Sequence, residues 1–347
     1  MITRPLFTPF KIKNIIVPTR IARAATGERM ADEEGRMPPG LAEYYANHAR
    51  DKVGLIQPGY TFVAEAGRCS PGQLGIHTDA AAEAFRPMLD GIHKYGAVAV
   101  VQLVYNFARS LRMPVEELAG IRDAFAEAAA RAKSVGFDGV SLHAAHGYLL
   151  SQFLSPFYNR RRDEYGGSVG NRARFPMEVL RAVRAKVGDD FFVMAKINTN
   201  DYLGEKGATE EMSIESCRIL ADAGLDMIET SGGMPRSIGQ ALYERPIESR
   251  EDEAFFRDFA IRLKKAADIP LMLTGGIRSY EVAEEIVRDG IADLVGMARP
   301  LMAEPGLARR WFEGDRRAAA CTNCNTRCRD AIRNGYCEIA AEAADNH

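Results

Sequence analysis

The sequence has no excess of charge of either sign. Lys and Arg together number 45 and Asp and Glu together number 47, so the formal net charge at pH 7 is −2. A protein that binds nucleic acid or an anionic membrane surface usually carries a strong positive balance that neutralises phosphates. The composition gives no reason to expect a nucleic-acid or membrane partner, and we expect a small-molecule substrate.

Long apolar runs are also missing. No stretch approaches the roughly 20 apolar residues that a membrane-spanning helix needs. The N-terminal segment MITRPLFTPFKIKN lacks the apolar core and the small-residue cleavage site of a secretory signal peptide. We therefore expect a soluble, cytoplasmic protein.

Cysteines are few, and four of the six crowd the C-terminal end at Cys321, Cys324, Cys328 and Cys337. In a cytosolic chain, such crowding suggests a metal or cluster site ahead of disulfides. The spacing C-x2-C-x3-C-x8-C suits the four thiolate ligands of a [4Fe–4S] cluster, and zinc is the competing ligand for four sulfurs. Metal-free thiols are the third reading, because spacing alone supports the other two.

The dinucleotide-binding pattern G-x-G-x-x-G is absent after every predicted strand, which weakens a Rossmann-like architecture. Apolar runs instead alternate with amphipathic stretches and predict eight buried strands, near residues 20–25, 53–59, 97–103, 138–142, 191–197, 225–231, 269–274 and 291–297. Eight such units predict an α/β protein built as a (β/α)8 TIM barrel. We expect this barrel, with a short N-terminal hairpin, over residues 1–314 and a cysteine-rich extension over residues 315–347.

The loops after the last two predicted strands are rich in glycine. In a barrel of this kind such loops commonly hold a phosphate, because backbone N–H groups can approach the anion closely. The candidate residues here are Gly275, Gly276, Gly296, Met297, Ala298 and Arg299. The alternative is that the glycines only make tight turns between strand and helix.

Lys196 lies inside the fifth predicted strand and has three interpretations. It could be a Schiff-base nucleophile, or a fixed positive charge beside an anionic cofactor or intermediate. A structural lysine in a salt bridge is the third, since buried lysines are rarely unpaired.

The stretch SLHAAHGYLLSQFLSP places His143, His146 and Tyr148 directly after the fourth predicted strand. A metal site is one reading, but H-x-x-H without a nearby carboxylate or thiol is a weak signature. Core histidines satisfied by the backbone are a second. The third is chemical: two imidazole donors can polarise a carbonyl oxygen, and a phenol can protonate a carbanion.

Together these features resemble the Old Yellow Enzyme family of flavin-dependent oxidoreductases. The resemblance runs from LFTPFKIKN to GMARPLMAEPGLARRW, and its most specific segment is GFDGVSLHAAHGYLLSQFLSPFYNRRRDEYGGSVGNRARFPMEVLRAVR. It implies a TIM barrel that binds FMN. The phosphate inferred at the glycine-rich loops would then be that of FMN. The further residues that it implies around the flavin are Ala25, Thr26, Gly59, Gln102, Lys196 and Gly233.

The resemblance also implies a reaction. NADH or NADPH would reduce FMN, and hydride would then pass to the C=C of an α,β-unsaturated carbonyl compound. His143 and His146 would hold the carbonyl oxygen, and Tyr148 would protonate the α-carbon. Lys196 would lie near N1 of the flavin, which displaces the Schiff-base interpretation.

Two features depart from the commoner pattern of that family. The segment ARSLRMPVEEL joins the third strand to its helix where relatives insert a long excursion, so we expect a wider site or one completed by another subunit of a homo-oligomer. The C-terminal cysteines resemble those of larger members such as 2,4-dienoyl-CoA reductase and trimethylamine dehydrogenase. The alternative function is accordingly a dehydrogenase, demethylase or electron-transfer subunit that passes electrons through an iron–sulfur cluster to a partner protein.

Overall fold

The computed structural model describes residues 4–106, 111, 113–237, 245–324, 328 and 337. Eight parallel strands close into a barrel, and each of them lies within or next to a stretch for which a strand was predicted. In chain order they are β3 (Ile21–Arg23), β4 (Leu55–Ile56), β6 (Val98–Val104), β7 (Gly139–Ala144), β8 (Phe192–Asn198), β9 (Met227–Ser231), β10 (Leu271–Thr274) and β11 (Leu294–Met297). Pairing of β4 with both β3 and β6 closes the ring, so the predicted (β/α)8 barrel is confirmed.

The barrel interior has an apolar layer below a polar one. Side chains alternate along a strand, so Val98 and Val100 point inward and Gln102 follows on the same face. The same alternation in β8 places Phe192 and Met194 in the apolar layer and Lys196 above them. The polar layer therefore lies at the carboxyl ends of the strands, where barrel enzymes place their active sites.

A hairpin covers the opposite end of the barrel. Strands β1 (Phe10–Ile12) and β2 (Ile15–Val17) pair antiparallel, as expected for the N-terminal segment. Ile12 and Val17 are buried in the same cluster as the apolar layer, which contains Leu55, Val98, Phe192, Met227 and Leu294. The hairpin thus closes the amino-terminal end of the barrel with side chains.

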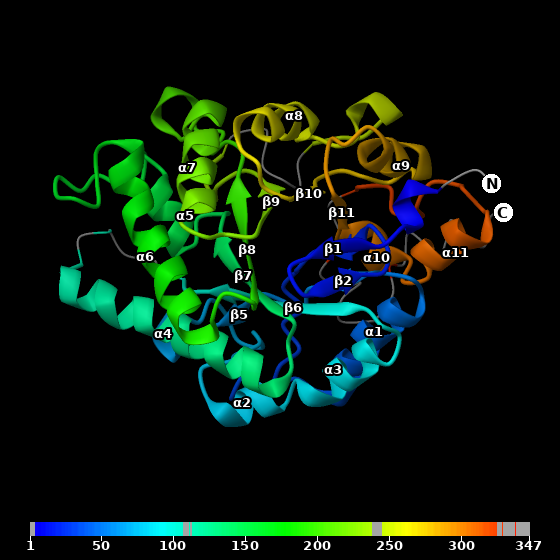
Figure 1. Ribbon diagram of the computed structural model, residues 1–347, viewed down its shortest axis with the longest axis horizontal. Helices are drawn as coiled ribbons and strands as arrows, with labels where there is room; N and C mark the ends of the chain where they lie inside the picture. Colours follow the sequence, from blue (N-terminus) through cyan, green and yellow to red (C-terminus); the bar gives the residue numbers. More distant parts are fainter. Residues whose placement is uncertain are drawn as a thin grey trace.

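Helices surround the strands, as Figure 1 shows. The longer ones are α1 (Pro39–Arg50), α3 (Arg86–His93), α4 (Val115–Val135), α6 (Val169–Val187), α7 (Glu210–Asp222), α8 (Arg257–Ala266) and α9 (Tyr280–Arg288), and the shorter ones are α2 (Asp79–Glu83), α5 (Leu149–Leu154), α10 (Arg299–Ala303) and α11 (Leu307–Glu313). Helix α4 buries one apolar stripe and ends at Val135, and its C-cap is Gly136, whose φ of 106° suits a glycine at that position. Because β6 ends at Val104 and α4 begins at Val115, the short connection predicted there is confirmed in length, although residues 107–110 and 112 lie outside the described residues.

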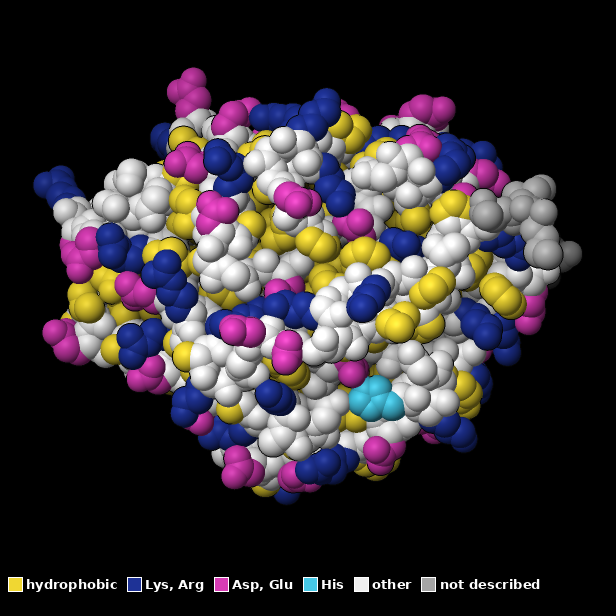
Figure 2. Space-filling model, in the orientation of Figure 1, with side chains coloured by type: hydrophobic (Ala, Val, Ile, Leu, Met, Phe, Trp, Pro, Cys, Tyr) yellow, Lys and Arg dark blue, Asp and Glu magenta, His cyan; other side chains and the backbone are white. Residues whose placement is uncertain are grey.

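The surface agrees with the balanced composition. On the face shown in Figure 2, basic and acidic side chains are interspersed, and neither sign gathers into one field. None of the described helices is long and apolar enough to cross a membrane.

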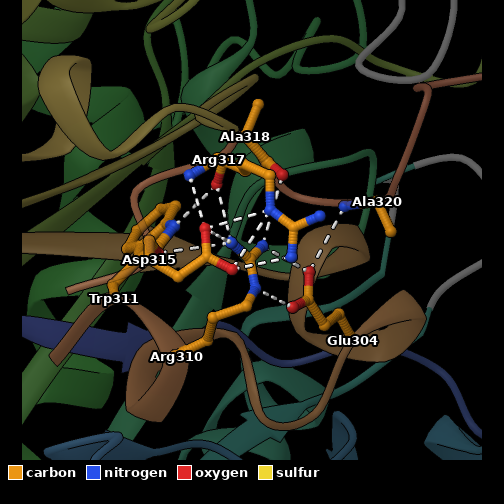
Figure 3. Close-up of polar contacts among 7 residues, drawn as sticks. All are labelled: Glu304, Arg310, Trp311, Asp315, Arg317, Ala318 and Ala320. Carbon is orange, nitrogen blue, oxygen red and sulfur yellow. Dashed lines mark hydrogen bonds and ion pairs between the residues drawn. The ribbon is translucent and has the colours of Figure 1, made fainter. Parts of the chain in front are cut away.

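Arg310 and Trp311 of α11 hold the chain that follows this helix. Arg310 donates to the backbone carbonyls of Asp315, Arg317 and Ala318 at 3.3, 3.0 and 3.3 Å, and its guanidinium also pairs with Glu304 (Figure 3). The indole of Trp311 is fully buried and donates to the Arg317 carbonyl at 3.1 Å. These bonds fix the path of residues 315–320, directly before the first C-terminal cysteine.

Replacing Arg310 with lysine should loosen this segment, because an ammonium group cannot reach several carbonyls in the fixed fork of a guanidinium. We expect the free energy of unfolding to fall by about 1–2 kcal/mol, measured by urea denaturation. Arg288→Lys is the matched control, because Arg288 pairs only with its exposed neighbour Asp289 in the described structure, and it should change little. Equal effects of the two substitutions would contradict this role of Arg310.

Candidate active site

The polar layer brings together residues from most of the strands. Strand order and register place them around one ring, with His143 of β7 opposite Lys196 of β8, and Lys196 opposite Glu229 of β9. The members of the layer are Gln57, Gln102, His143, Lys196, Glu229 and Thr274, all of them buried. The resulting site lies at the open end of the barrel, away from the hairpin.

Lys196 is held in a buried ion pair. Its Nζ lies 2.9 Å from Glu229 Oε1, and the two side chains are 4% and 0% exposed. Thr274 Oγ1 donates to the same carboxylate at 3.0 Å, and Gln57 Nε2 donates to its other oxygen at 2.9 Å. The structure therefore supports the interpretation of Lys196 as a structural lysine in a salt bridge. The same arrangement is compatible with a fixed positive charge beside an anionic cofactor or intermediate.

His143 of the polar layer lies beside His146 and Tyr148, which follow it in the loop after β7. The His143 ring centroid is 5.1 Å from that of His146 and 4.6 Å from that of Tyr148, both in edge-on contact. The turn before α5 makes this possible, since His146 and Gly147 have φ angles of 61° and 83°. The backbone N–H of His146 also donates to Asn198 Oδ1 at 3.2 Å, which fixes the turn against β8.

Both histidines are neutral at pH 7. Burial is the main cause that lowers their pKa values, to about 3 for His146 and well below the ordinary range for His143, and the positive charge of Lys196 contributes. His143 Nδ1 accepts from the backbone N–H of Ala145 at 3.4 Å, so its Nε2 carries the ring hydrogen and can donate. His146 Nε2 lies 2.7 Å from Ser231 Oγ, so a substrate oxygen would compete with Ser231 for this nitrogen.

Tyr148 is protonated at neutral pH and contacts two groups that sequence reasoning did not single out. Burial is the main cause that raises its pKa far above the ordinary value, followed by the nearby Tyr60 and Cys69, which also interact with its hydroxyl. The rings of Tyr60 and Tyr148 are 5.5 Å apart. Tyr60 directly follows the predicted residue Gly59, so its position after a strand end was the available signal.

The loop after β3 carries a second charged cluster. Arg23 is fully buried and lies 3.7 Å from Glu28, and it donates to Thr26 Oγ1 at 2.8 Å. Thr26 in turn donates to Glu28 Oε1 at 2.5 Å, as does the hydroxyl of Tyr45 on α1. Thr26, which was predicted to lie along the flavin beside Ala25, is thus held by hydrogen bonds with Arg23 and Glu28. The sequence pattern did not reveal either of these partners.

Two buried amide atoms fit a ring ligand that offers hydrogen-bonding groups at its edge. Gln102 Nε2 and Gln57 Oε1 have no partner within the described structure, although both side chains are fully buried. An unpaired buried amide is costly, and a ligand that accepts from Gln102 would remove that cost. Gly59 lies against the Glu28 carboxylate, and a Cβ at that position would be 1.8 Å from Glu28 Oε2. These residues fit the pyrimidine edge of a flavin.

The glycine-rich loops after β10 and β11 do make tight turns. Gly275 and Gly276 have φ angles of 145° and 71°, which L side chains rarely adopt. Gly296 lies beside Thr274, and a Cβ there would be 1.9 Å from Thr274 Oγ1. The same residues can bring backbone N–H groups to a phosphate, so the turn role and the phosphate role are compatible. Gly233, after β9, also has a positive φ of 88° and donates to the Asn200 carbonyl at 3.0 Å.

Arg299 and the C-terminal cysteines lie around one small cavity beside α10. Its lining is Arg299, Met302, Ala303, Cys321, Thr322, Cys324, Cys328 and Cys337. Arg299 follows Met297 and Ala298 at the end of β11, so the cavity adjoins the predicted phosphate loop. Across the described part of the chain, no group of His, Cys, Asp or Glu side chains forms a site that could hold a single metal ion.

Sequence comparison places the chain among flavin oxidoreductases. The profile of the NADH:flavin oxidoreductase / NADH oxidase family matches residues 5–111 and 105–317. An NADH oxidase of Thermoanaerobacter brockii is 30% identical over 93% of this chain and 53% of its own length. An NADPH dehydrogenase of Bacillus velezensis is 32% identical over 88% of this chain and 94% of its own length.

Solved structures agree with the fold. A 2-naphthoyl-CoA reductase in complex with 2-naphthoyl-CoA matches with a TM-score of 0.87 at 26% identity, over 97% of this chain and 57% of that one. An Old Yellow Enzyme homologue from Zymomonas mobilis matches with a TM-score of 0.75 at 24% identity, over 96% of both chains.

The relatives fall into two length classes. The chain spans about half the length of the NADH oxidase and of a metal reductase of Desulforamulus reducens, and nearly the full length of the NADPH dehydrogenase. The chain belongs to the NADH:flavin oxidoreductase / NADH oxidase family, the Old Yellow Enzyme family that its strand-end residues indicated.

Proposed function

We propose that this protein is an FMN-dependent NAD(P)H oxidoreductase that reduces the C=C of α,β-unsaturated carbonyl compounds. The observation that carries the proposal is the grouping of His143, His146 and Tyr148 at the open end of the barrel, where the ring centroids of His146 and Tyr148 lie 5.1 and 4.6 Å from that of His143. Two imidazoles and a phenol at one place suit a reaction that develops negative charge on a carbonyl oxygen and needs a proton at the adjacent carbon.

The cofactor proposal rests on the residues around the open end. Gln102 would donate to the pyrimidine edge of the flavin, Ala25, Thr26 and Gly59 would line the ring, and Lys196 would place a positive charge near N1. Gly233, Gly275, Gly276, Gly296, Met297, Ala298 and Arg299 would hold the ribityl phosphate side. FMN, when bound, accepts a hydride from NAD(P)H and delivers it to the β-carbon of the alkene.

The substrate proposal follows from the protonation states. His143 is neutral and its Nε2–H can donate to the carbonyl oxygen. His146 can add a second donor if the carbonyl displaces the Ser231 hydroxyl. Because burial keeps Tyr148 protonated, its hydroxyl holds the proton that the α-carbon receives.

Tyr148→Phe tests the assignment of the proton donor. We expect purified holoenzyme to show flavin absorbance that NADH or NADPH bleaches anaerobically at an unchanged rate in the variant. Reoxidation by 2-cyclohexen-1-one should slow by about a hundredfold or more, which is the usual contribution of a general acid. Colourless protein that does not take up FMN would overturn the proposed function, and unchanged reoxidation would overturn the role of Tyr148.

Gln102→Leu tests the proposed contact with the flavin edge. Removing a donor to the bound ring should raise the Kd for FMN by about tenfold, or about 1.4 kcal/mol, measured by fluorescence quenching of free FMN. The apoprotein should be no less stable than wild type, because Gln102 Nε2 has no partner within the described structure. An unchanged Kd would rule out this contact.

A second candidate function is electron transfer through the C-terminal tail. The observation that favours it is the convergence of Cys321, Cys324, Cys328 and Cys337 on one cavity with Arg299. Arg299 also follows the loop proposed to hold the phosphate, so a [4Fe–4S] cluster there would lie near the FMN. In that case a partner protein would donate or accept electrons, and turnover would need an electron carrier.

Metal analysis distinguishes these possibilities. Anaerobically purified protein should contain iron and acid-labile sulfide in equal amounts, and Cys324→Ser should lower both. Cys217→Ala is the matched control, since Cys217 is buried in α7 and should leave the iron content unchanged. If the protein contains zinc without iron, the cysteines hold a structural zinc ion and not a cluster. If it contains neither metal, the second candidate function, electron transfer through the C-terminal tail, is wrong.

A further inference from the structure

The hydroxyl of Tyr148 has two protic neighbours that belong to the loop between β4 and α2. The ring centroid of Tyr60 lies 5.5 Å from that of Tyr148 and 6.2 Å from that of His143. The Cys69 thiol also interacts with the Tyr148 hydroxyl. Neither neighbour has a role in the reaction as described so far.

One buried glutamine holds both neighbours in place. Gln73 is 3% exposed, and its Oε1 accepts from the backbone N–H of Cys69 at 2.6 Å. Its Nε2 donates to the backbone carbonyl of Tyr60 at 3.2 Å. Gln73 therefore fixes the distance between the segments that carry Tyr60 and Cys69, which a merely space-filling residue would not do.

Tyr60 is also confined on its remaining side. A Cβ at Gly27 would lie 2.8 Å from Tyr60 Cε1, so the ring packs directly on the backbone of the β3 loop. The phenol is thus held between Gly27, His143 and Tyr148, and it cannot turn away from the site without moving that loop.

Cys69 connects this cluster to the surface. It lines an open groove of about 560 Å³ together with Ala31, Asp32, Glu33, Glu65, Arg68, Ser70, Pro71 and Gly72. Tyr148 itself does not line this groove. Cys69 therefore borders the groove and also interacts with the phenol at the active site.

We propose that Tyr60 and Cys69 are positioning residues that orient the Tyr148 hydroxyl and return a proton to it after each turnover. This inference rests on the proposed function. The O–H bond of Tyr148 breaks as the α-carbon gains its proton, and the phenolate then takes a proton from the Tyr60 hydroxyl or the Cys69 thiol. The Cys69 thiolate is reprotonated by solvent in the groove that it lines, and Tyr60 regains its proton through Tyr148, which interacts with both groups, so each turnover consumes one solvent proton and one hydride.

The protonation states agree with this direction of transfer. Burial raises the pKa of the Cys69 thiol to about 11, and burial also raises the pKa of Tyr60. Both groups are therefore neutral donors at pH 7. A phenolate in this buried place would be unstable without them, because burial disfavours the charged form.

Tyr60→Phe and Cys69→Ala are the primary test. We expect each to slow the oxidation of reduced FMN by 2-cyclohexen-1-one by about tenfold, and to raise the solvent deuterium isotope effect on that step, while reduction by NAD(P)H is unchanged. Cys69→Ser, which keeps a protic group, should recover most of the rate. Tyr95→Phe, an exposed tyrosine on the surface, is the matched control.

A second measurement does not depend on turnover. The contact with Tyr148 lowers the pKa of Cys69, so Tyr148→Phe should slow alkylation of Cys69 by iodoacetamide at pH 9 relative to wild type. Peptide mass spectrometry separates Cys69 from the other five cysteines. Unchanged alkylation would show that the thiol and the phenol do not interact.

The two levels of failure are distinguishable. If wild-type holoenzyme is reduced by NAD(P)H but not reoxidised by any enone, the proposed function fails and this inference falls with it. If wild type reduces enones and Tyr148→Phe is slow, yet Tyr60→Phe and Cys69→Ala behave like Tyr95→Phe, only the inference is overturned.

Discussion

The buried ion pair between Lys196 and Glu229 is the interaction around which the polar layer is built. Each charge would be strongly unfavourable alone in the barrel, so the two must lie on neighbouring strands in register, as they do in β8 and β9. Gln57 and Thr274 bring β4 and β10 to the same carboxylate. Side chains from four of the eight strands therefore meet at one carboxylate. This contact fixes the register of those strands, and with it the positions of the neighbouring histidines and Gln102.

Much of the fold could be predicted because the strands are apolar on both faces and recur at regular intervals. The site could be predicted in outline for a related reason: in a parallel barrel all strands end at the same rim, so residues such as Gln102 and His143 must meet there. The resemblance to a family then supplied the roles that patterning alone left open.

What the sequence did not reveal depends on partners distant in the chain. Glu229 looks like any strand residue until Lys196 is found opposite to it, and the Arg23–Glu28 cluster depends on Tyr45 of α1. Cys69 lies far in the sequence from the four C-terminal cysteines and has no motif around it, although Gln73 and Tyr148 give it a defined place. Single-residue patterns cannot show such pairs, since the pairing is a property of the packed structure.

The N-terminal hairpin determines from which end of the barrel ligands reach the polar layer. Because β1 and β2 cover one end with Ile12 and Val17, ligands reach the polar layer of the described barrel from the carboxyl ends of its strands. Under the proposed function, the nicotinamide donor and the alkene acceptor would both approach from that end, so each would compete with the other for the same face of the site.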